Sequence, residues 1–146
     1  MTDPFDLNRF LSAQAGVYPQ VLSELSAGQK RSHWIWFIFP QMKGLGQSSH
    51  SHFYGIGSLE EAATYWHHPI LGPRLEECTI LVNQVQKRTI EQILGYPDDL
   101  KFRSSMTLFS RAEPDSTVFA QALDKYFAGK LDQLTLELLD ENLPDK

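Results

Sequence analysis

The segment at residues 30–41, with the sequence KRSHWIWFIFPQ, constrains the fold more than any other part of the chain. Seven of the eight residues from 33 to 40 are apolar, and two of the three tryptophans lie among them. Neither helical nor strand periodicity leaves this run a solvated face, so we expect it to be covered on all sides. Because its entrance is polar and charged, we also expect a site to adjoin this core.

The secondary structure of this segment has two interpretations. Ser32 can cap a short helix that runs to Phe39, with Pro40 close to its end. A buried strand is the alternative, because aromatic and β-branched residues favour strands. We predict the helix, since the chain offers no other convincing strand to pair with this one.

Start and stop signals predict helices along the rest of the chain. Asp3 as a cap, followed by Pro4, starts a first helix that Gly16 ends. Capping boxes start two later helices, at residues 58–61 and 89–92. The helices predicted besides the central one are at residues 3–15, 18–27, 58–66, 71–85, 89–94, 97 to the turn at 113–115, 118–128 and 132–140. Residues 42–57, rich in glycine and serine, are expected to form a loop.

These elements predict an all-α fold, a compact multihelical array of eight or nine short helices. A chain of 146 residues can bury a sizeable core, and neither a repeat nor a low-complexity linker divides it. We therefore expect one globular domain that spans residues 1–146.

Composition and charge argue against several classes of protein. A net charge of -5 is unlike a general nucleic-acid binder, which shows a basic excess or stripe. The start of the chain lacks the features of a signal peptide, and no apolar run approaches the ~18 residues of a membrane span. The one cysteine, Cys78, suits a reducing compartment and is expected to be a small buried apolar residue. We expect a cytoplasmic protein.

A first group of candidate site residues lies at the entrance of the aromatic segment. Lys30 and Arg31 precede a predicted helix N-terminus, where the helix dipole disfavours cations. Their placement is explained if an anion binds there, whether a phosphate, a carboxylate or an acid of the protein itself. His33, in the same first turn, could donate to this anion. The alternative is that the cations are solvated or paired and that His33 is a hydrogen-bonded core histidine.

A second group lies at residues 98–105. On a helix, Asp98 and Lys101 share one face with Ser105, whereas Asp99 and Arg103 share another. One interpretation is ion pairing on a solvated helix surface, which contributes a few tenths of a kcal/mol per pair. The other interpretation is a pocket shared by Lys101, Arg103, Ser104, Ser105, His33 and Trp36.

The histidines do not predict a metal site. The pairs His50/His52 and His67/His68 lack the cysteine, carboxylate or histidine partners of known zinc motifs. No phosphate-binding glycine loop, dinucleotide motif or nucleophile elbow is present either. We expect no metal and no cofactor.

Several segments of the chain carry a resemblance to a known family: residues 3–7, 32–41, 44–46, 58–62, 68–75 and 97–109, together with Tyr54. They resemble the bacterial domain-of-unknown-function family 1810, over essentially residues 3–128. The resemblance implies a compact multihelical fold and no established activity. Some members carry the label calpastatin, but that inhibitor is a disordered chain, whereas the apolar stripes here are those of a folded domain. The polar residues of the family pattern that this chain keeps include His33, Gln41, His68, Arg74, Asp98, Lys101, Arg103 and Ser104.

Together these observations favour a protein that binds a small anionic ligand, such as a nucleotide or a sugar phosphate, in a polar and aromatic pocket walled by Trp34 and Trp36. The side chains expected to bind it are Lys30, Arg31, Ser32, Trp34, Trp36, Gln41, Arg74, Lys101, Arg103, Ser104 and Ser105. If the protein is an enzyme, His33 with Asp98 or Asp99 is the candidate for acid–base catalysis.

Two other hypotheses fit the same residues. A non-catalytic protein-interaction module would use the loop at residues 42–57 as its contact surface. A purely structural role would make the two charged groups a buried ion-pair network that holds the central helix in place.

Overall fold

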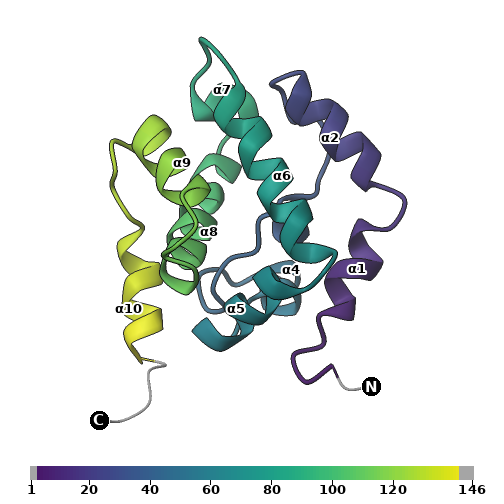
Figure 1. Cartoon of the computed structure of the whole chain (residues 1–146), viewed down its shortest axis with the longest axis vertical. Helices are drawn as coiled ribbons and strands as arrows, with labels where there is room; N and C mark the ends of the chain where they lie inside the picture. Colours follow the sequence, from purple (N-terminus) through teal and green to yellow (C-terminus); the bar gives the residue numbers. More distant parts are fainter. Residues whose placement is uncertain (1–2, 142–146) are drawn as a thin grey trace.

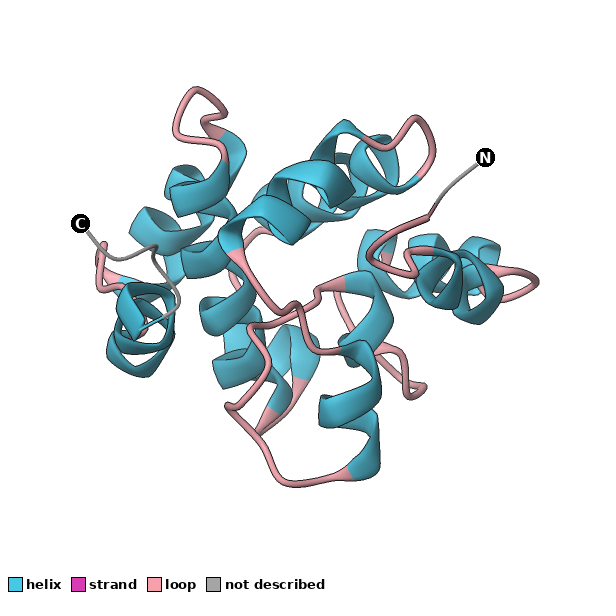
Figure 2. Ribbon diagram, turned by 90° about the horizontal axis from the view of Figure 1, so that it is seen from below, coloured by secondary structure: helices cyan, strands magenta, loops and turns pink. Residues whose placement is uncertain are grey.

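The computed structural model describes residues 3–141, and its regular structure is helical throughout that range (Figure 2). Its ten helices are α1 Asn8–Gln14, α2 Tyr18–Ser26, α3 Ile35–Ile38, α4 Ser49–Tyr54, α5 Leu59–His67, α6 Leu71–Gln84, α7 Ile90–Leu94, α8 Asp98–Ala112, α9 Val118–Phe127 and α10 Gln133–Glu141. The only β-structure in this range is an isolated parallel bridge between Met42 and Ile56. The all-α prediction is therefore confirmed, with ten helices in place of eight or nine.

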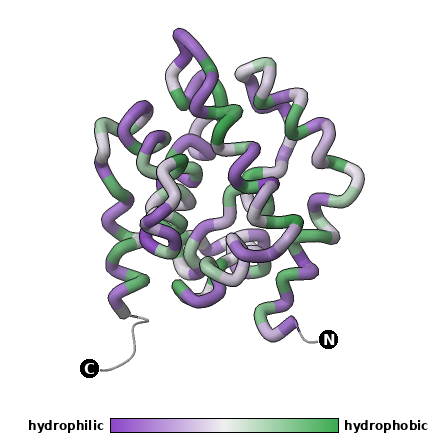
Figure 3. The backbone as a smooth tube through the Cα atoms, in the orientation of Figure 1, coloured by the Kyte–Doolittle hydropathy of each residue, from purple (hydrophilic) through white to green (hydrophobic). Residues whose placement is uncertain are grey.

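Helix α8 lies beside α9 and α10, and α1 and α10 lie on opposite sides of the molecule (Figure 1). It packs against α3, α5, α7, α9 and α10, while α6 packs against α2, α5 and α9. Hydrophilic and hydrophobic residues alternate along the helices (Figure 3), so that each helix turns an apolar side toward a shared core. None of the helices in residues 3–141 combines the length and apolar character needed to cross a membrane.

The aromatic segment lies in this core, as expected, but only one turn of it is helical. Trp34, Ile35, Ile38 and Phe39 are buried, and the ring of Phe39 packs edge-on against Phe102 of α8 with centroids 4.9 Å apart. The other two aromatic side chains of the segment, at positions 36 and 37, are half-buried. The segment therefore attaches the N-terminal helices to α8.

The predicted cap of this helix is wrong. Trp34 occupies the N-cap position of α3, where its side chain makes no capping hydrogen bond, and Ser32 lies two residues earlier. The Ser32 hydroxyl donates instead to the carboxylate of Glu24 in α2. As a cap the Ser32 oxygen would accept a backbone N–H in a neutral hydrogen bond, whereas here the hydroxyl donates to an ionised carboxylate in a stronger, charge-assisted one.

Other local signals were more reliable. The capping box of Thr89 and Gln92 is formed at the start of α7, and the Ser58 hydroxyl accepts the backbone N–H of Glu61 in α5. The Glu61 carboxylate does not close a second box, because it accepts the backbone N–H of Gly57 and pairs with Arg9.

The segment expected to be a loop, residues 42–57, contains a helix that the sequence analysis missed. Helix α4 starts after Ser48, whose hydroxyl accepts the backbone N–H of Ser51. The two ends of the segment are joined by backbone hydrogen bonds. Lys43 N donates to the carbonyl of Ile56 and Ile56 N donates to the carbonyl of Gln41, both at 2.8 Å. The glycines of this segment flank α4 and leave its interior helical.

Cys78 is buried in α6, as predicted. Burial raises the pKa of its thiol to about 12, which keeps it protonated and unreactive at neutral pH. Its role is therefore in packing.

Candidate functional site

The entrance of the aromatic segment wraps around the carboxylate of Glu24, in the last turn of α2. Glu24 Oε1 accepts the backbone N–H groups of Arg31 and Ser32, at 2.8 and 3.2 Å, and the indole N–H of Trp34 at 2.8 Å. Glu24 Oε2 accepts the Ser32 hydroxyl at 2.7 Å and the Gln20 amide at 3.0 Å. Five donors therefore converge on one buried carboxylate.

The Glu24 carboxylate is an anion at the entrance of the aromatic segment, where the sequence predicts one. Burial by itself raises the pKa of Glu24, but hydrogen bonds from Arg31, Ser32, Trp34 and Gln20 outweigh burial and lower the pKa to about 2. Glu24 is thus ionised at neutral pH and satisfies the donors around it. Of the first group of candidate residues, Arg31 and Ser32 therefore contact an acid of the protein itself, through their backbone N–H groups and the Ser32 hydroxyl.

Lys30 connects the aromatic segment to the start of α8. Its Nζ lies 2.8 Å from Asp98 Oδ2 and 5.1 Å from the ring centroid of Trp34, and its side chain is only 6% exposed. The second oxygen of the same carboxylate, Asp98 Oδ1, lies 3.5 Å from Nζ of Lys101. The two groups of candidate residues are therefore neighbours, joined through Asp98.

A surface depression of about 230 Å³ lies between the start of α8, the chain that follows α3 and the start of α10. Its polar lining includes four of the predicted ligand-binding residues, Gln41, Lys101, Arg103 and Ser104, and one carboxylate, Asp132. The rest of the lining is apolar and consists of Leu45, Pro97, Leu100 and Leu134. We call this cavity the α8 depression.

The two cations of the α8 depression are loosely paired. Lys101 Nζ lies 3.5 Å from Asp98, and an Arg103 Nη atom lies 3.6 Å from Asp132. Both distances exceed the 2.7–2.9 Å that is typical of charge-assisted hydrogen bonds. Within residues 3–141 neither side chain donates a hydrogen bond, and Arg103 Nε is buried without a partner. The side-chain amide of Gln41 is likewise unbonded in that range.

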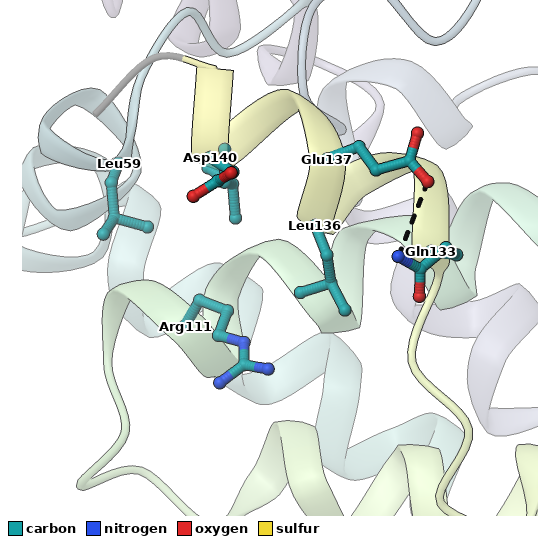
Figure 4. A pocket seen from close by; sticks show the side chains of 7 residues that line it. Leu59, Arg111, Gln133, Leu136, Glu137 and Asp140 are labelled. Carbon is teal, nitrogen blue, oxygen red and sulfur yellow. Dashed lines mark hydrogen bonds between the residues drawn. The ribbon is translucent and has the colours of Figure 1, made fainter.

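Charge distinguishes the α8 depression from others on the described surface. Its lining carries two cations and one carboxylate, a formal charge of +1. The depression in Figure 4, about 460 Å³ between α5, α8 and α10, is lined by Arg111 with Glu137 and Asp140, a formal charge of -1. The α8 depression is therefore the better match for an anion.

Arg9 lies beside two further depressions but has no free donor for a ligand. Its guanidinium donates to the carbonyl groups of Phe5, Asp6, Phe53 and Gly55 and to the Glu61 carboxylate. A guanidinium has five N–H groups, so these contacts use its full capacity. Arg9 holds α1, α4 and α5 together.

The predicted acid–base residues do not assemble. His33 is exposed on the loop before α3, and no hydrogen bond or ion pair links its imidazole to any residue that the structure describes. Asp98 is engaged by the two lysines, and Asp99 is buried with one carboxylate oxygen lacking a partner. No hydrogen bond or ion pair in the described chain joins these three side chains to one another.

Three further predicted residues lie away from the α8 depression. Trp34 is in the core, 2% exposed, and Ser105 is fully buried with an unpartnered hydroxyl. Arg74 lies on α6, where it donates to Gln14 at 3.1 Å and covers the ring of Tyr18 at 4.5 Å. Their surroundings explain them as parts of the packing between helices.

Two further predicted residues, Arg31 and Trp36, are not part of the lining of the α8 depression. Arg31 is exposed, and its guanidinium donates to the Gln29 side chain at 3.4 Å. Trp36 is half-buried, and Lys101 Nζ lies 4.3 Å from its ring centroid. The depression and Trp36 are therefore adjacent through Lys101.

Sequence reasoning missed Glu24, His50 and Asp132. Glu24 had a usable signal, because an acid in the last turn of a helix is disfavoured by the helix dipole and must find compensation elsewhere. His50, which stacks on the Trp36 ring at 4.8 Å, and Asp132 had none. Their contacts depend on the packing of α4 and α10, which no local pattern specifies.

The comparisons with known proteins agree with this fold. The family described as "Protein of unknown function (DUF1810)" matches residues 4–139, so the chain belongs to that family, as the resemblance implied. The chain is also similar to a solved structure, the conserved hypothetical protein Rv1873 from Mycobacterium tuberculosis. The two share 59% sequence identity and a TM-score of 0.93, over 94% of this chain and 99% of that one. No curated protein matches the chain.

Proposed function

We propose that the protein binds a small anionic ligand, a nucleotide or a sugar phosphate, in the α8 depression. The observation that carries this proposal is the pair of cations Lys101 and Arg103, which line one depression and donate no hydrogen bond within residues 3–141. A phosphate group accepts hydrogen bonds from both side chains, and an arginine can hold it through two parallel bonds.

The neighbouring side chains suit the same ligand. Gln41 offers an amide without a partner in the described chain, and Ser104 a hydroxyl that now donates to the carbonyl of Leu100 at 3.2 Å. Leu100 and Leu134 are 43% and 49% exposed, so they give the depression apolar walls. A ligand with a phosphate and a less polar body satisfies both kinds of lining.

The test is a thermal-shift and calorimetric titration with inorganic phosphate, sugar phosphates and nucleoside monophosphates. We expect saturable stabilisation of the wild type, which is lost in the double variant Lys101→Ala, Arg103→Ala. The matched control is Arg31→Ala, Arg111→Ala, which removes the same charge from two exposed arginines outside the depression and should keep the shift. Equal loss in both double variants, or no stabilisation by any of these anions, would refute the proposal.

A second candidate function, a protein-interaction module that uses residues 42–57, is favoured by one observation. Phe53 of α4 is 55% exposed and lines two depressions. A single exposed aromatic ring is common on proteins that do not use it for binding, so we rank this function second. Phe53→Ser should leave anion binding unchanged and weaken the binding of a protein partner, measured by titration.

A further inference from the structure

We infer that the ligand of the α8 depression carries a planar ring, which stacks on Trp36 in the place that the His50 imidazole now holds. The inference rests on the anion-binding function proposed above and narrows its ligand to an aromatic phosphate of the nucleotide type. A simple sugar phosphate lacks the ring and is excluded.

The position of Trp36 is the first step in the argument. Its ring is half-buried and is contacted by Lys101, whose Nζ lies 4.3 Å from the centroid. Gln41 and Leu45 line the α8 depression and also line a small hollow beside Trp36. An anion held by Lys101 and Arg103 therefore has an aromatic face within reach of the rest of the ligand.

The group that now covers Trp36 is the second step. The imidazole of His50 stacks on the ring with centroids 4.8 Å apart and planes inclined by 26°. His50 is exposed, and within residues 3–141 its imidazole makes no hydrogen bond or ion pair, only ring contacts with Trp36 and Tyr54. A planar group thus already occupies the tryptophan face, without the polar contacts that would fix it there.

The third step is that His50 can leave without disturbing the core. It belongs to α4, which is six residues long and lies in the segment at residues 42–57. The two ends of this segment are joined by the bridge between Met42 and Ile56. Arg9 holds α4 through the carbonyl groups of Phe53 and Gly55, so the imidazole leaves by rotation of its own exposed side chain while α4 keeps its place. A larger heteroaromatic ring covers more of the indole than an imidazole does, and each stacked base contributes about tenfold or more in affinity.

The experiment compares ligands that share a phosphate and differ in the ring. Ribose 5-phosphate, adenosine 5′-monophosphate and cytidine 5′-monophosphate are titrated by calorimetry, with tryptophan fluorescence as a second readout. We expect both nucleotides to bind about tenfold more tightly than ribose 5-phosphate and to quench fluorescence. Trp36→Leu should remove the difference and leave ribose 5-phosphate binding unchanged. Should that variant fail to fold, Trp36→Phe should reduce the difference.

The His50→Ala variant is the more direct test, because it removes the group that the ligand is inferred to displace. We expect nucleotide binding several-fold tighter and ribose 5-phosphate binding unaltered, whereas His52→Ala, on the same helix, should change neither. Equal affinities for all three ligands, or weaker nucleotide binding in His50→Ala, would overturn the inference. If ribose 5-phosphate binds and the nucleotides bind no more tightly, the proposed anion binding is supported and the inferred ring preference is refuted. If none of the three binds, both fall.

Discussion

Two cationic segments of this chain differ in whether their hydrogen-bond donors have partners within the protein. At the entrance of the aromatic segment, five donors converge on Glu24, and Lys30 lies 2.8 Å from Asp98. At the start of α8, Lys101 and Arg103 lie 3.5 and 3.6 Å from their carboxylates and donate no hydrogen bond within the described chain. In the first segment the protein itself satisfies Lys30 and the donors around Glu24 and leaves Arg31 exposed, whereas in the second segment both cations keep donors that a ligand can use.

This difference shows when a group of cations indicates a ligand. Buried polar groups in folded proteins are almost always hydrogen-bonded, so a cluster whose donors are satisfied internally has a sufficient structural cause. Both segments look equally suited to an anion in the sequence. Only the donors that stay free after folding point to a site.

The largest effect on stability is expected at the first segment, where the protein's own Glu24 accepts five hydrogen bonds. Glu24→Ala would leave the N–H groups of Arg31, Ser32 and Trp34 without their acceptor, and we expect a loss of about 3 kcal/mol or more in the free energy of unfolding. Chemical denaturation measures it. Glu76→Ala, an exposed acid on α6, is the control and should change stability by less than about 0.5 kcal/mol. A similar loss in both variants would contradict the role given to Glu24.

The same carboxylate should make stability depend on pH at the acid end. The pKa of Glu24 is lowered from 4.5 to about 2 in the folded state, so the unfolded chain binds this proton first as the pH falls. The stabilisation is fully present above the unfolded pKa and is lost between about pH 5 and pH 2, by on the order of 3 kcal/mol. Unfolding curves across this range should show wild type and Glu24→Gln converging. Parallel curves would argue against the lowered pKa.

A smaller effect should separate the two kinds of ion pair. The Lys30–Asp98 pair has little exposure and close contact, so a double-mutant cycle with Lys30→Ala and Asp98→Ala should give a coupling of about 1–2 kcal/mol. The Arg103–Asp132 pair is longer and more exposed, and its coupling should be below about 0.5 kcal/mol. Equal couplings would remove the distinction between the two segments.

The smallest effect on stability is expected in the α8 depression itself. Lys101→Ala and Arg103→Ala should each change the free energy of unfolding by no more than about 0.5 kcal/mol, because neither side chain makes a hydrogen bond that unfolding would break within the described chain. Thermal and chemical denaturation of both variants without ligand test this. A loss of several kcal/mol in either would give these cations a structural role and weaken the proposed site.

Local signals predicted most helices correctly because the physics behind them is local. The capping box of Thr89 and Gln92 involves one turn of backbone, and Gly16, with a φ of +81°, ends the turn after α1 by a conformation that other residues adopt at a cost. The apolar stripe of α8, formed by Phe102, Met106 and Phe109, is fully buried as its spacing indicated. These features are determined within a few residues of the chain.

The failures have the opposite origin. Helix α4 lies in a segment whose glycines predicted a loop, but they flank the helix, and its rings at His50 and Tyr54 pack on the aromatic segment. The capping role expected for Ser32 was replaced by a bond to Glu24, from another helix. In both cases a contact between elements overrode the local preference.

The sequence by itself determined the all-α class, the central aromatic segment and the two groups of charged residues around it. Tertiary structure decided which of those charges are paired, because Glu24 and Asp132 reach their partners only through the packing of α2 and α10. Helix formation follows from short-range periodicity and capping, which a sequence displays directly. The pairing of charges depends on distances between side chains of different elements, and these exist only once the helices have packed.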